Sequence, residues 1–358
     1  MLARAPRLGR RPLWGAIALL VVALACLPPL LSHDVYSYVD YARLGAAHGI
    51  DPYLRGPAAA PGDPAFIHVT WPRTTTAYGP LFTLATYPLA ALPPGTAVYV
   101  LKAASAAAVF GIAAIVARLA PSRGIDPLRA AAFVALNPLV LVHVVGGPHN
   151  DALAVLLVML SVAAILCARE SSGGAAFVAA IAVKASSAAV LPFALIGSAP
   201  EQSTGRTVIH SATHRPVAGV LLGGAGGAIA IGAAAHAAFG WHWLGAIGLA
   251  GENQSRTSYM SIPITAARLT GLDPALTRAA ALVLYAALVA YLLAWTLRGG
   301  DWVRAAAWAT TGLLLATSWL LPWYLLWPLP LAALSRDRAL KLLLLALTAF
   351  QLGARIPL

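Results

Sequence analysis

The sequence predicts an all-α protein, a polytopic transmembrane helical bundle with about 9 to 11 membrane segments. Of the 358 residues, 60% are hydrophobic and 10% are charged, whereas soluble domains carry about 25% charged residues. The apolar runs are about 20 residues long and do not alternate polar with apolar residues, which favours helices over a β-barrel. We find no internal repeat and no linker, so residues 1–358 are expected to form one transmembrane domain.

The formal net charge of +12 reflects 24 Lys and Arg residues against 12 Asp and Glu residues. The basic residues lie at the ends of apolar runs, a pattern that marks cytoplasmic segments and attracts anionic lipid head groups. No basic stretch is interleaved with aromatic residues, so we expect membrane lipids, and no nucleic acid, as partners. The basic clusters are Arg4, Arg7, Arg10 and Arg11; Arg118, Arg123 and Arg129; Arg298 and Arg304; and Arg336, Arg338 and Lys341.

The first predicted span, 13–31, crosses from the cytoplasm to the outside of the cytoplasmic membrane. The arginines before it and the sequence "ALAC" also fit a signal peptide. Because the apolar core is long enough to span, we favour an uncleaved helix with a cytoplasmic N-terminus.

The polar first outer loop, 32–77, is predicted to begin with a helix over 34–48. Its apolar residues recur at helical spacing, so this helix should lie flat in the membrane interface. Its polar residues Asp34, Ser37, Asp40 and Arg43 should point away from the apolar face. The apolar positions are Val35, Tyr38, Val39, Ala42 and Ala46.

The later segments follow from apolar runs and their basic ends. Lys184 and Pro192 interrupt the run over 173–197, which we expect to dip into the membrane as two half-helices and return. The loop 198–215, with Arg206 and Arg215, would then be cytoplasmic. The other predicted segments are an interfacial or re-entrant helix over 78–92; spans over 96–119, 128–145, 152–168, 216–239, 274–297 and 303–320; a return from the turn at 321–330 to Arg336; and a last span ending near Gln351.

This topology places three polar clusters on the outer side, namely the Asp34 helix, His149-Asn150-Asp151 and 252–256. An Asp at a helix start either caps the helix or, kept ionised by the helix dipole, serves as a general base. Asn150 and Asp151 could likewise cap the next helix. The histidines lack zinc-ligand spacing, so no metal is predicted.

Two lysines in apolar surroundings need explanation. A cation at the centre of a membrane costs on the order of 2.5–3.5 kcal/mol on insertion scales, so we expect Lys102 and Lys184 to have anionic partners. A cluster of aromatic residues near the end of the chain forms either an interfacial belt, which we favour, or a sugar platform. This cluster comprises Trp319, Trp323, Tyr324 and Trp327.

Four short blocks resemble the actinobacterial polyprenol-phosphate-mannose-dependent α-1,6-mannosyltransferases of the GT-C superfamily of membrane glycosyltransferases. Their order and approximate spacing are similar, whereas "TSYMSIPITAARLTG" matches only loosely and leaves the acceptor open. The chain is also shorter than those enzymes, which carry additional spans. The blocks are "SHDVYSYVDYARLGAAHGIDPY" (32–53), "WPRTTTAYGPL" (71–81), "NPLVLVHVVGGPHNDAL" (137–153) and "LPWYLLWPLPL" (321–331).

The resemblance implies a GT-C fold and transfer of a hexose, with mannose favoured over arabinofuranose or glucose, from a polyprenyl-phosphate donor to an extracytoplasmic glycan or glycolipid, with inversion. Asp34 matches the position of the catalytic base. The absence of a Gly-rich nucleotide motif agrees with a lipid-linked donor and no cofactor. The expected substrate-binding residues are Tyr36, Tyr38, Arg55, Arg73, Tyr78, His149, Asn150, Asp151, Lys184, Arg256, Trp323 and Tyr324.

A different class of function stays open. A transporter or lipid flippase without transferase activity would carry buried charges in paired broken helices. Lys184 is the feature of the sequence that points to that alternative.

Overall fold

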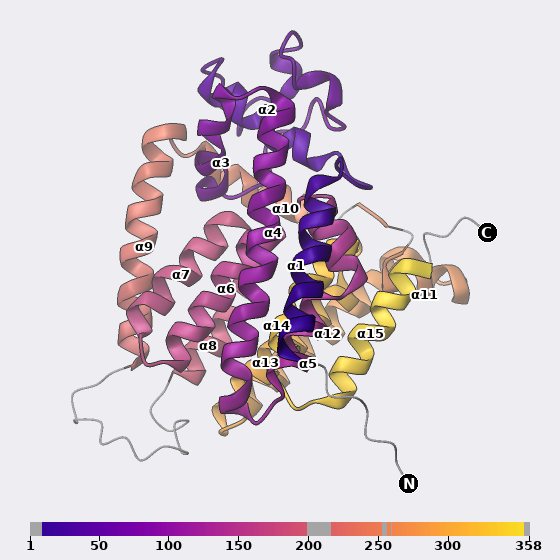
Figure 1. The fold of residues 1–358 in the computed structure, drawn as a ribbon. Coiled ribbons are helices and arrows are strands. Elements are labelled where there is room, and N and C mark those ends of the chain that lie inside the picture. The colour runs from indigo at the N-terminus through magenta and orange to yellow at the C-terminus, as the bar shows by residue number, and fades with distance from the viewer. Residues whose placement is uncertain (1–8, 199–215, 253–255, 259, 354–358) are drawn as a thin grey trace.

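A computed structural model describes residues 9–198, 216–252, 256–258 and 260–353 (Figure 1). The described residues form helices and turns without a strand, which confirms the all-α polytopic fold. The chain between α1 and α4 caps one end of the bundle, which is the upper end in Figure 1. The helices of the first half are α1 (Arg10–Cys26), α2 (Asp34–Ala46), α3 (Pro80–Thr86), α4 (Pro94–Leu119), α5 (Pro127–Ala135), α6 (Asp151–Leu166), α7 (Glu170–Val183) and α8 (Leu191–Gly197).

Three helical segments are long and apolar enough to cross a membrane, namely Pro94–Arg123, Val217–Phe239 and Pro274–Leu297. A fourth candidate is a bent pair, described below, and several apolar helices are shorter. The count of 9 to 11 segments stays a prediction. The helices of the second half are α9 (Pro216–Phe239), α10 (Gly245–Glu252), α11 (Ile262–Thr270), α12 (Pro274–Leu297), α13 (Trp302–Ala316), α14 (Leu329–Ala333) and α15 (Arg338–Gly353).

The span predicted over 128–145 is bent. Helix α5 ends at Ala135, and a π-helix, Val140–Gly146, continues at an angle of 61°. Pro138 lacks the N–H that a helix requires at this point. The side chain of Asn137 accepts a hydrogen bond from the Leu139 N–H at 3.0 Å, so the break is stabilised locally. The bent pair still counts as one candidate span, but the prediction over 128–145 did not include the bend.

The interruption at Lys184 is present as predicted. Lys184 is extended (φ −151°, ψ 120°) between α7 and a 3₁₀ turn, Ala185–Val190, that leads into α8. The Gly79 N–H donates to the Val183 carbonyl at 3.1 Å, which anchors the break from outside the segment. Gly197 at the end of α8 packs on Trp302 at the start of α13. The segment thus returns to the end of the bundle where α7 starts (Figure 1). The predicted side for Arg206 and Arg215 concerns residues outside the described part of the chain.

Helix α2 forms as predicted, its position in the membrane interface stays a prediction, and two of its polar side chains are buried. Ser37 and Asp40 are as buried as the apolar residues beside them. The loop that follows wraps around the helix and is fastened by Arg43, whose Nε donates to Asp63 at 2.8 Å. Arg43 also donates to the Ala90 carbonyl at 2.8 Å. The polar side chains of α2 point away from its apolar face, as expected, and Ser37 and Asp40 are buried there.

Candidate functional site

A cavity of about 490 Å³ lies between α2, the loop after it, the break at Lys184 and the segment that follows α13. Among the described residues, Asp34, His149, Lys184 and Arg256 bring a carboxylate, an imidazole, an ammonium and a guanidinium group to its wall. The rest of its wall is largely aromatic. Residues from segments more than 200 positions apart in sequence therefore meet in one chamber, which is concave and mostly apolar like ligand sites in general.

Asp34 is the first residue of α2, and its side chain makes no capping hydrogen bond. The side chain is 25% exposed and lines the cavity. Burial raises the pKa of Asp34 above 3.8, whereas the positive charge of Lys184 acts in the opposite direction. The capping alternative is therefore not adopted. The role of Asp34 as an ionised general base stays a prediction, and desolvation is the largest influence on its pKa.

His149 lies beside Asp34. Its Nδ1 is 3.7 Å from the Asp34 carboxylate, too long for a hydrogen bond, and its ring stacks on Trp323 with centroids 3.5 Å apart. Burial, followed by the charge of Lys184, holds the pKa of His149 well below 6.5. His149 is thus a neutral imidazole at physiological pH. Among the described residues that line the cavity, Asp34 is the one carboxylate.

Lys184 has the anionic partner that was predicted. Its ammonium lies 2.6 Å from the carboxylate of Asp151, and the other oxygen of that carboxylate accepts a hydrogen bond from Trp327 Nε1, also at 2.6 Å. Asp151 is fully buried behind the cavity wall. Neither Asn150 nor Asp151 caps α6 through its side chain. Asp151 instead holds Lys184 at the cavity surface.

Lys102 was also predicted to have an anionic partner, and the structure gives it a neutral one. It is fully buried in α4, and its ammonium donates to the Gly146 carbonyl at 2.6 Å. In the part of the chain that the structure describes, no carboxylate bonds to it. A carbonyl dipole at the end of the π-helix replaces the predicted anion.

Arg256 lies between two tryptophans. Its guanidinium carbon is 5.0 Å from the centroid of the Trp71 ring and 4.8 Å from that of Trp319. A cation within about 6 Å of an aromatic face is attracted by the ring quadrupole. The two rings thereby hold the guanidinium at the cavity wall without neutralising its charge.

The aromatic residues near the end of the chain line the cavity. Tyr324 stacks on Trp327 with centroids 4.3 Å apart, and Lys184 lies 5.1 Å from the Tyr324 ring. On the opposite wall, Tyr38 and Tyr78 meet edge to face at 4.7 Å. The described aromatic wall comprises Tyr38, Tyr41, Trp71, Tyr78, Tyr285, Trp319, Trp323, Tyr324 and Trp327. This placement fits the sugar-platform alternative better than the interfacial belt that we favoured.

Several predicted site residues lie elsewhere. Arg55 and Arg73 are exposed on the loop and do not line the cavity. Tyr36 packs on His68, with centroids 4.6 Å apart, and Asn150 is buried behind His149. Among the described residues, no group of three or more His, Cys, Asp and Glu side chains gathers as a metal site would require.

Sequence reasoning missed Trp71, Tyr41 and Tyr285 as cavity residues. Trp71 opens the quoted block "WPRTTTAYGPL", so a signal was present for that residue. Tyr285 lies in the middle of the apolar helix α12, where nothing in the local sequence distinguishes it from a lipid-facing side chain.

Comparison with known proteins places the chain in a family. Residues 1–199 match the model of the α-(1→6)-mannopyranosyltransferase N-terminal domain. The α-(1→6)-mannopyranosyltransferase A of Mycobacterium tuberculosis is 31% identical over 91% of this chain and 67% of its own length. The protein of the same name from Corynebacterium glutamicum is 32% identical over 49% of this chain and 36% of its own length.

A further α-(1→6)-mannopyranosyltransferase of M. tuberculosis is 32% identical over 40% of this chain and 25% of its own length. The chain thus spans between a quarter and two thirds of the length of these relatives. No solved structure matches it. By the match over more than half of its residues, the chain belongs to the α-(1→6)-mannopyranosyltransferase family.

Proposed function

We propose that this protein is a membrane mannosyltransferase that moves mannose from a polyprenyl-phosphate donor to an extracytoplasmic glycan or glycolipid, with inversion at the anomeric carbon. The observation that carries the proposal is one cavity in which Asp34, the one carboxylate among the described lining residues, shares aromatic walls with two cations. Family membership supports the mannosyl group and the α-(1→6) linkage.

In the proposed reaction, a hydroxyl group of the acceptor donates its proton to Asp34. The acceptor oxygen forms a bond to the anomeric carbon while the bond from that carbon to the phosphate oxygen breaks. The electron pair of the broken bond leaves with polyprenyl phosphate, which needs no proton from the enzyme. One carboxylate is therefore sufficient, in contrast to glycoside hydrolases, which use two. A positioned base of this kind contributes roughly 10²–10⁴-fold to the rate.

Lys184 and Arg256 are the proposed partners of the leaving phosphate. Both line the cavity, and both are held in place by other residues, Lys184 by Asp151 and Arg256 by two indole rings. Fixed cations stabilise developing negative charge without reorganising during the reaction. The proposal therefore does not use Arg55 and Arg73, which lie outside the cavity.

The cavity also offers a path for the lipid. Leu282 of α12 lines the cavity and is 58% exposed on the outer surface of the bundle. Its neighbours Val283 and Leu284 are 68% and 70% exposed. An isoprenoid chain leaving the cavity past Leu282 would meet the apolar surface of α12, while the phosphate and sugar stay between the charged and aromatic walls.

The direct test is transfer of radiolabelled mannose from polyprenyl-phosphate mannose to a membrane glycolipid extract by purified protein. We expect Asp34→Asn to abolish transfer while the protein is still recovered folded. Asp51→Asn is the matched control, because Asp51 lies in the same loop, pairs with His242 and does not line the cavity. Transfer by Asp34→Asn within a few-fold of wild type would reject Asp34 as the base.

The transporter alternative has one structural observation in its favour. Two segments are discontinuous, namely the bent pair of α5 with the π-helix and the pair of α7 with α8. Paired broken helices are typical of secondary transporters. Proteoliposomes that accumulate or flip polyprenyl-phosphate mannose, without forming a glycosylated product, would favour this alternative over the transferase.

A further inference from the structure

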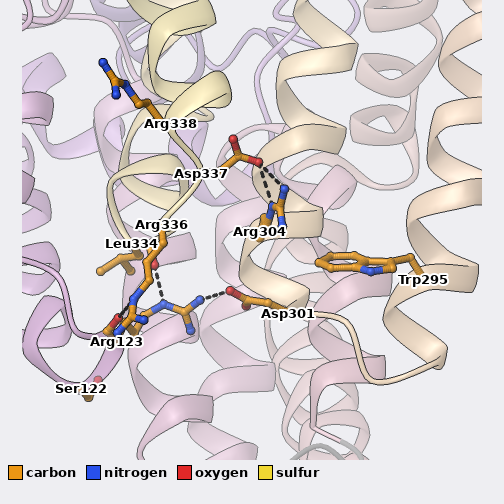
Figure 2. Close-up of a pocket in the computed structure, with 9 residues that line it drawn as sticks. All are labelled: Ser122, Arg123, Trp295, Asp301, Arg304, Leu334, Arg336, Asp337 and Arg338. Carbon is orange, nitrogen blue, oxygen red and sulfur yellow. Dashed lines mark hydrogen bonds and ion pairs between the residues drawn. The ribbon is translucent and has the colours of Figure 1, made fainter.

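A second cavity lies at the other end of the bundle. It has a volume of about 560 Å³ and is formed by the chain after α4, the start of α13 and the chain between α14 and α15 (Figure 2). Helix α13 begins at this cavity and ends at the cavity of Asp34. Its 15 residues correspond to a length of about 22 Å. The two cavities are therefore separate sites.

Both acidic residues of this second cavity accept hydrogen bonds from the protein and form ion pairs with its arginines. Asp301 accepts a hydrogen bond from the Val303 N–H at 3.1 Å and pairs with Arg123. Asp337 accepts from Trp308 Nε1 at 2.8 Å and pairs with Arg304 at 2.7 Å. Figure 2 shows these two ion pairs side by side. Both carboxylates serve the fold and neutralise one arginine each.

Two further arginines line the cavity without a carboxylate. Arg336 Nε donates to the Arg123 carbonyl at 3.0 Å, and no acceptor among the described residues bonds to its two terminal nitrogens. The guanidinium of Arg336 lies against Gly124, where a Cβ would collide with it, and Gly124 has a left-handed φ of +65°. Arg338 is exposed at the rim. The four arginines and two aspartates that line the cavity leave it a formal charge of +2.

We propose that this basic cavity binds a phosphate group. A guanidinium presents parallel N–H donors that match two oxygens of one phosphate, and such pairs are stronger than neutral hydrogen bonds. Arg336 supplies the donors, and the ion pairs of Arg123 and Arg304 hold the neighbouring wall. Arg338 points away from these ion pairs in Figure 2 and adds positive charge at the rim.

The phosphate can be carried by a lipid or be free in solution, and the surroundings of the cavity accommodate both sources. Trp295 forms an apolar wall under Arg304, 5.5 Å from its guanidinium carbon. On the same helix, Tyr291 and Leu297 are 63% and 68% exposed. A phospholipid would place its head group among the arginines and its acyl chains along α12, whereas free phosphate would use the guanidinium groups alone.

The test measures lipid binding to the purified full-length protein by native mass spectrometry. The probes are dioleoyl phosphatidic acid, with dioleoyl phosphatidylcholine as the neutral comparison, each with and without inorganic phosphate. We expect phosphatidic acid to bind in preference to phosphatidylcholine. The double variant Arg336→Gln/Arg338→Gln should weaken this binding by about 10- to 100-fold, since hydrogen bonds from a charged donor are stronger than neutral ones.

The matched control is Arg118→Gln/Arg129→Gln, which removes two exposed arginines from the same end of the bundle but outside the cavity. Its binding should stay within about two-fold of wild type, because neither side chain lines the cavity. Arg336→Lys keeps the charge and loses the parallel donors, so it should bind less well than wild type even if the double variant fails to fold.

Displacement of bound lipid by inorganic phosphate would assign the site to phosphate from either source. Lipid that resists displacement would assign it to a phospholipid head group. Equal binding by the cavity variants and the control would overturn the proposal, as would failure of wild type to bind either probe. None of these outcomes depends on mannosyl transfer, so the test is independent of the role of Asp34.

Discussion

The carboxylate of Asp151 lies 2.6 Å from the ammonium of Lys184. The carboxylate is fully buried and the lysine side chain is 18% exposed toward the cavity. This pair joins the start of α6 to the break between α7 and the following 3₁₀ turn. It turns a backbone interruption into a fixed position for a cation that faces the proposed donor phosphate.

The Asp151–Lys184 pair should be required for stability. We expect Asp151→Asn to lower the free energy of unfolding by about 3–5 kcal/mol, because it leaves a largely buried charge without its partner. Replacing both residues, as Asp151→Asn/Lys184→Met, should restore part of this loss. Thermal unfolding of the purified variants, followed by tryptophan fluorescence, measures both effects. Additive losses in the double variant would show that the two side chains are not energetically coupled.

The rate of mannosyl transfer should depend on pH through Asp34. Burial raises the pKa of this carboxyl, and only its ionised form accepts a proton, so the rate should fall as pH falls through the raised pKa.

Lys184 lowers the pKa of Asp34, so Lys184→Gln should move the acidic limb of the pH–rate profile to higher pH. It should also reduce the rate by about 10²–10³-fold if Lys184 stabilises the leaving phosphate. Initial rates measured across the pH range report both changes. If the acidic limb of the pH–rate profile does not move in Lys184→Gln, the charges of Lys184 and Asp34 do not interact as proposed.

Asp40 should make the protein less stable as pH rises. Both of its carboxylate oxygens are buried without a hydrogen-bond partner among the described residues. Burial, with the charge of Asp63, raises its pKa from 3.8 to about 7. The folded protein therefore holds this proton more tightly than the unfolded chain does. Stability from this group is full below about pH 4, falls between pH 4 and about 7, and is constant above that range.

Asp40→Asn removes this titration. Relative to wild type, the variant should gain up to about 4 kcal/mol between pH 4 and pH 7.5, at 1.36 kcal/mol per pH unit. Melting temperatures of both proteins at several pH values test the prediction. Asp51→Asn is the control, since Asp51 is partly exposed and paired with His242. Parallel curves for wild type and Asp40→Asn would contradict the assignment.

Glycine at position 223 should be essential for the contact between α7 and α9. A Cβ at Gly223 would collide with the backbone of Ser171, whereas a Cβ at Gly226 would meet open space. We expect Gly223→Ala to destabilise the protein by about 1–3 kcal/mol, the range for overpacking. Gly226→Ala should be neutral or stabilising by up to about 1 kcal/mol, because Ala is the better helix former. Thermal unfolding of the two variants compares them directly, and equal effects would refute the close approach.

The sequence was sufficient for those features that local chemistry determines. The need of Lys184 for an anion follows from the cost of a charge among apolar residues, and Asp151 supplies it. The helix at Asp34 follows from apolar residues at helical spacing. The break at Pro138 was equally readable, because a proline inside an apolar run interrupts a helix, yet the span predicted over 128–145 did not include it.

Other features depend on contacts between distant segments. Burial of Asp40 requires the loop to fold over α2, and a helical pattern cannot report which surface a later loop will cover. The placement of Arg256 between Trp71 and Trp319 joins three segments of the chain, so no local window contains it. The resemblance pointed to Asp34 and His149, but only the fold separates Lys184 and Arg256, which line the cavity, from the exposed Arg55 and Arg73.

The order of Asp151 and Lys184 along the chain has a consequence for biosynthesis. The carboxylate precedes the ammonium by 33 positions, so it leaves the ribosome first. When the hairpin that carries Lys184 enters the lipid, α6 and its acidic residue are already made and available as a counter-ion. The cation therefore needs no prolonged stay in hydrocarbon without a counter-charge.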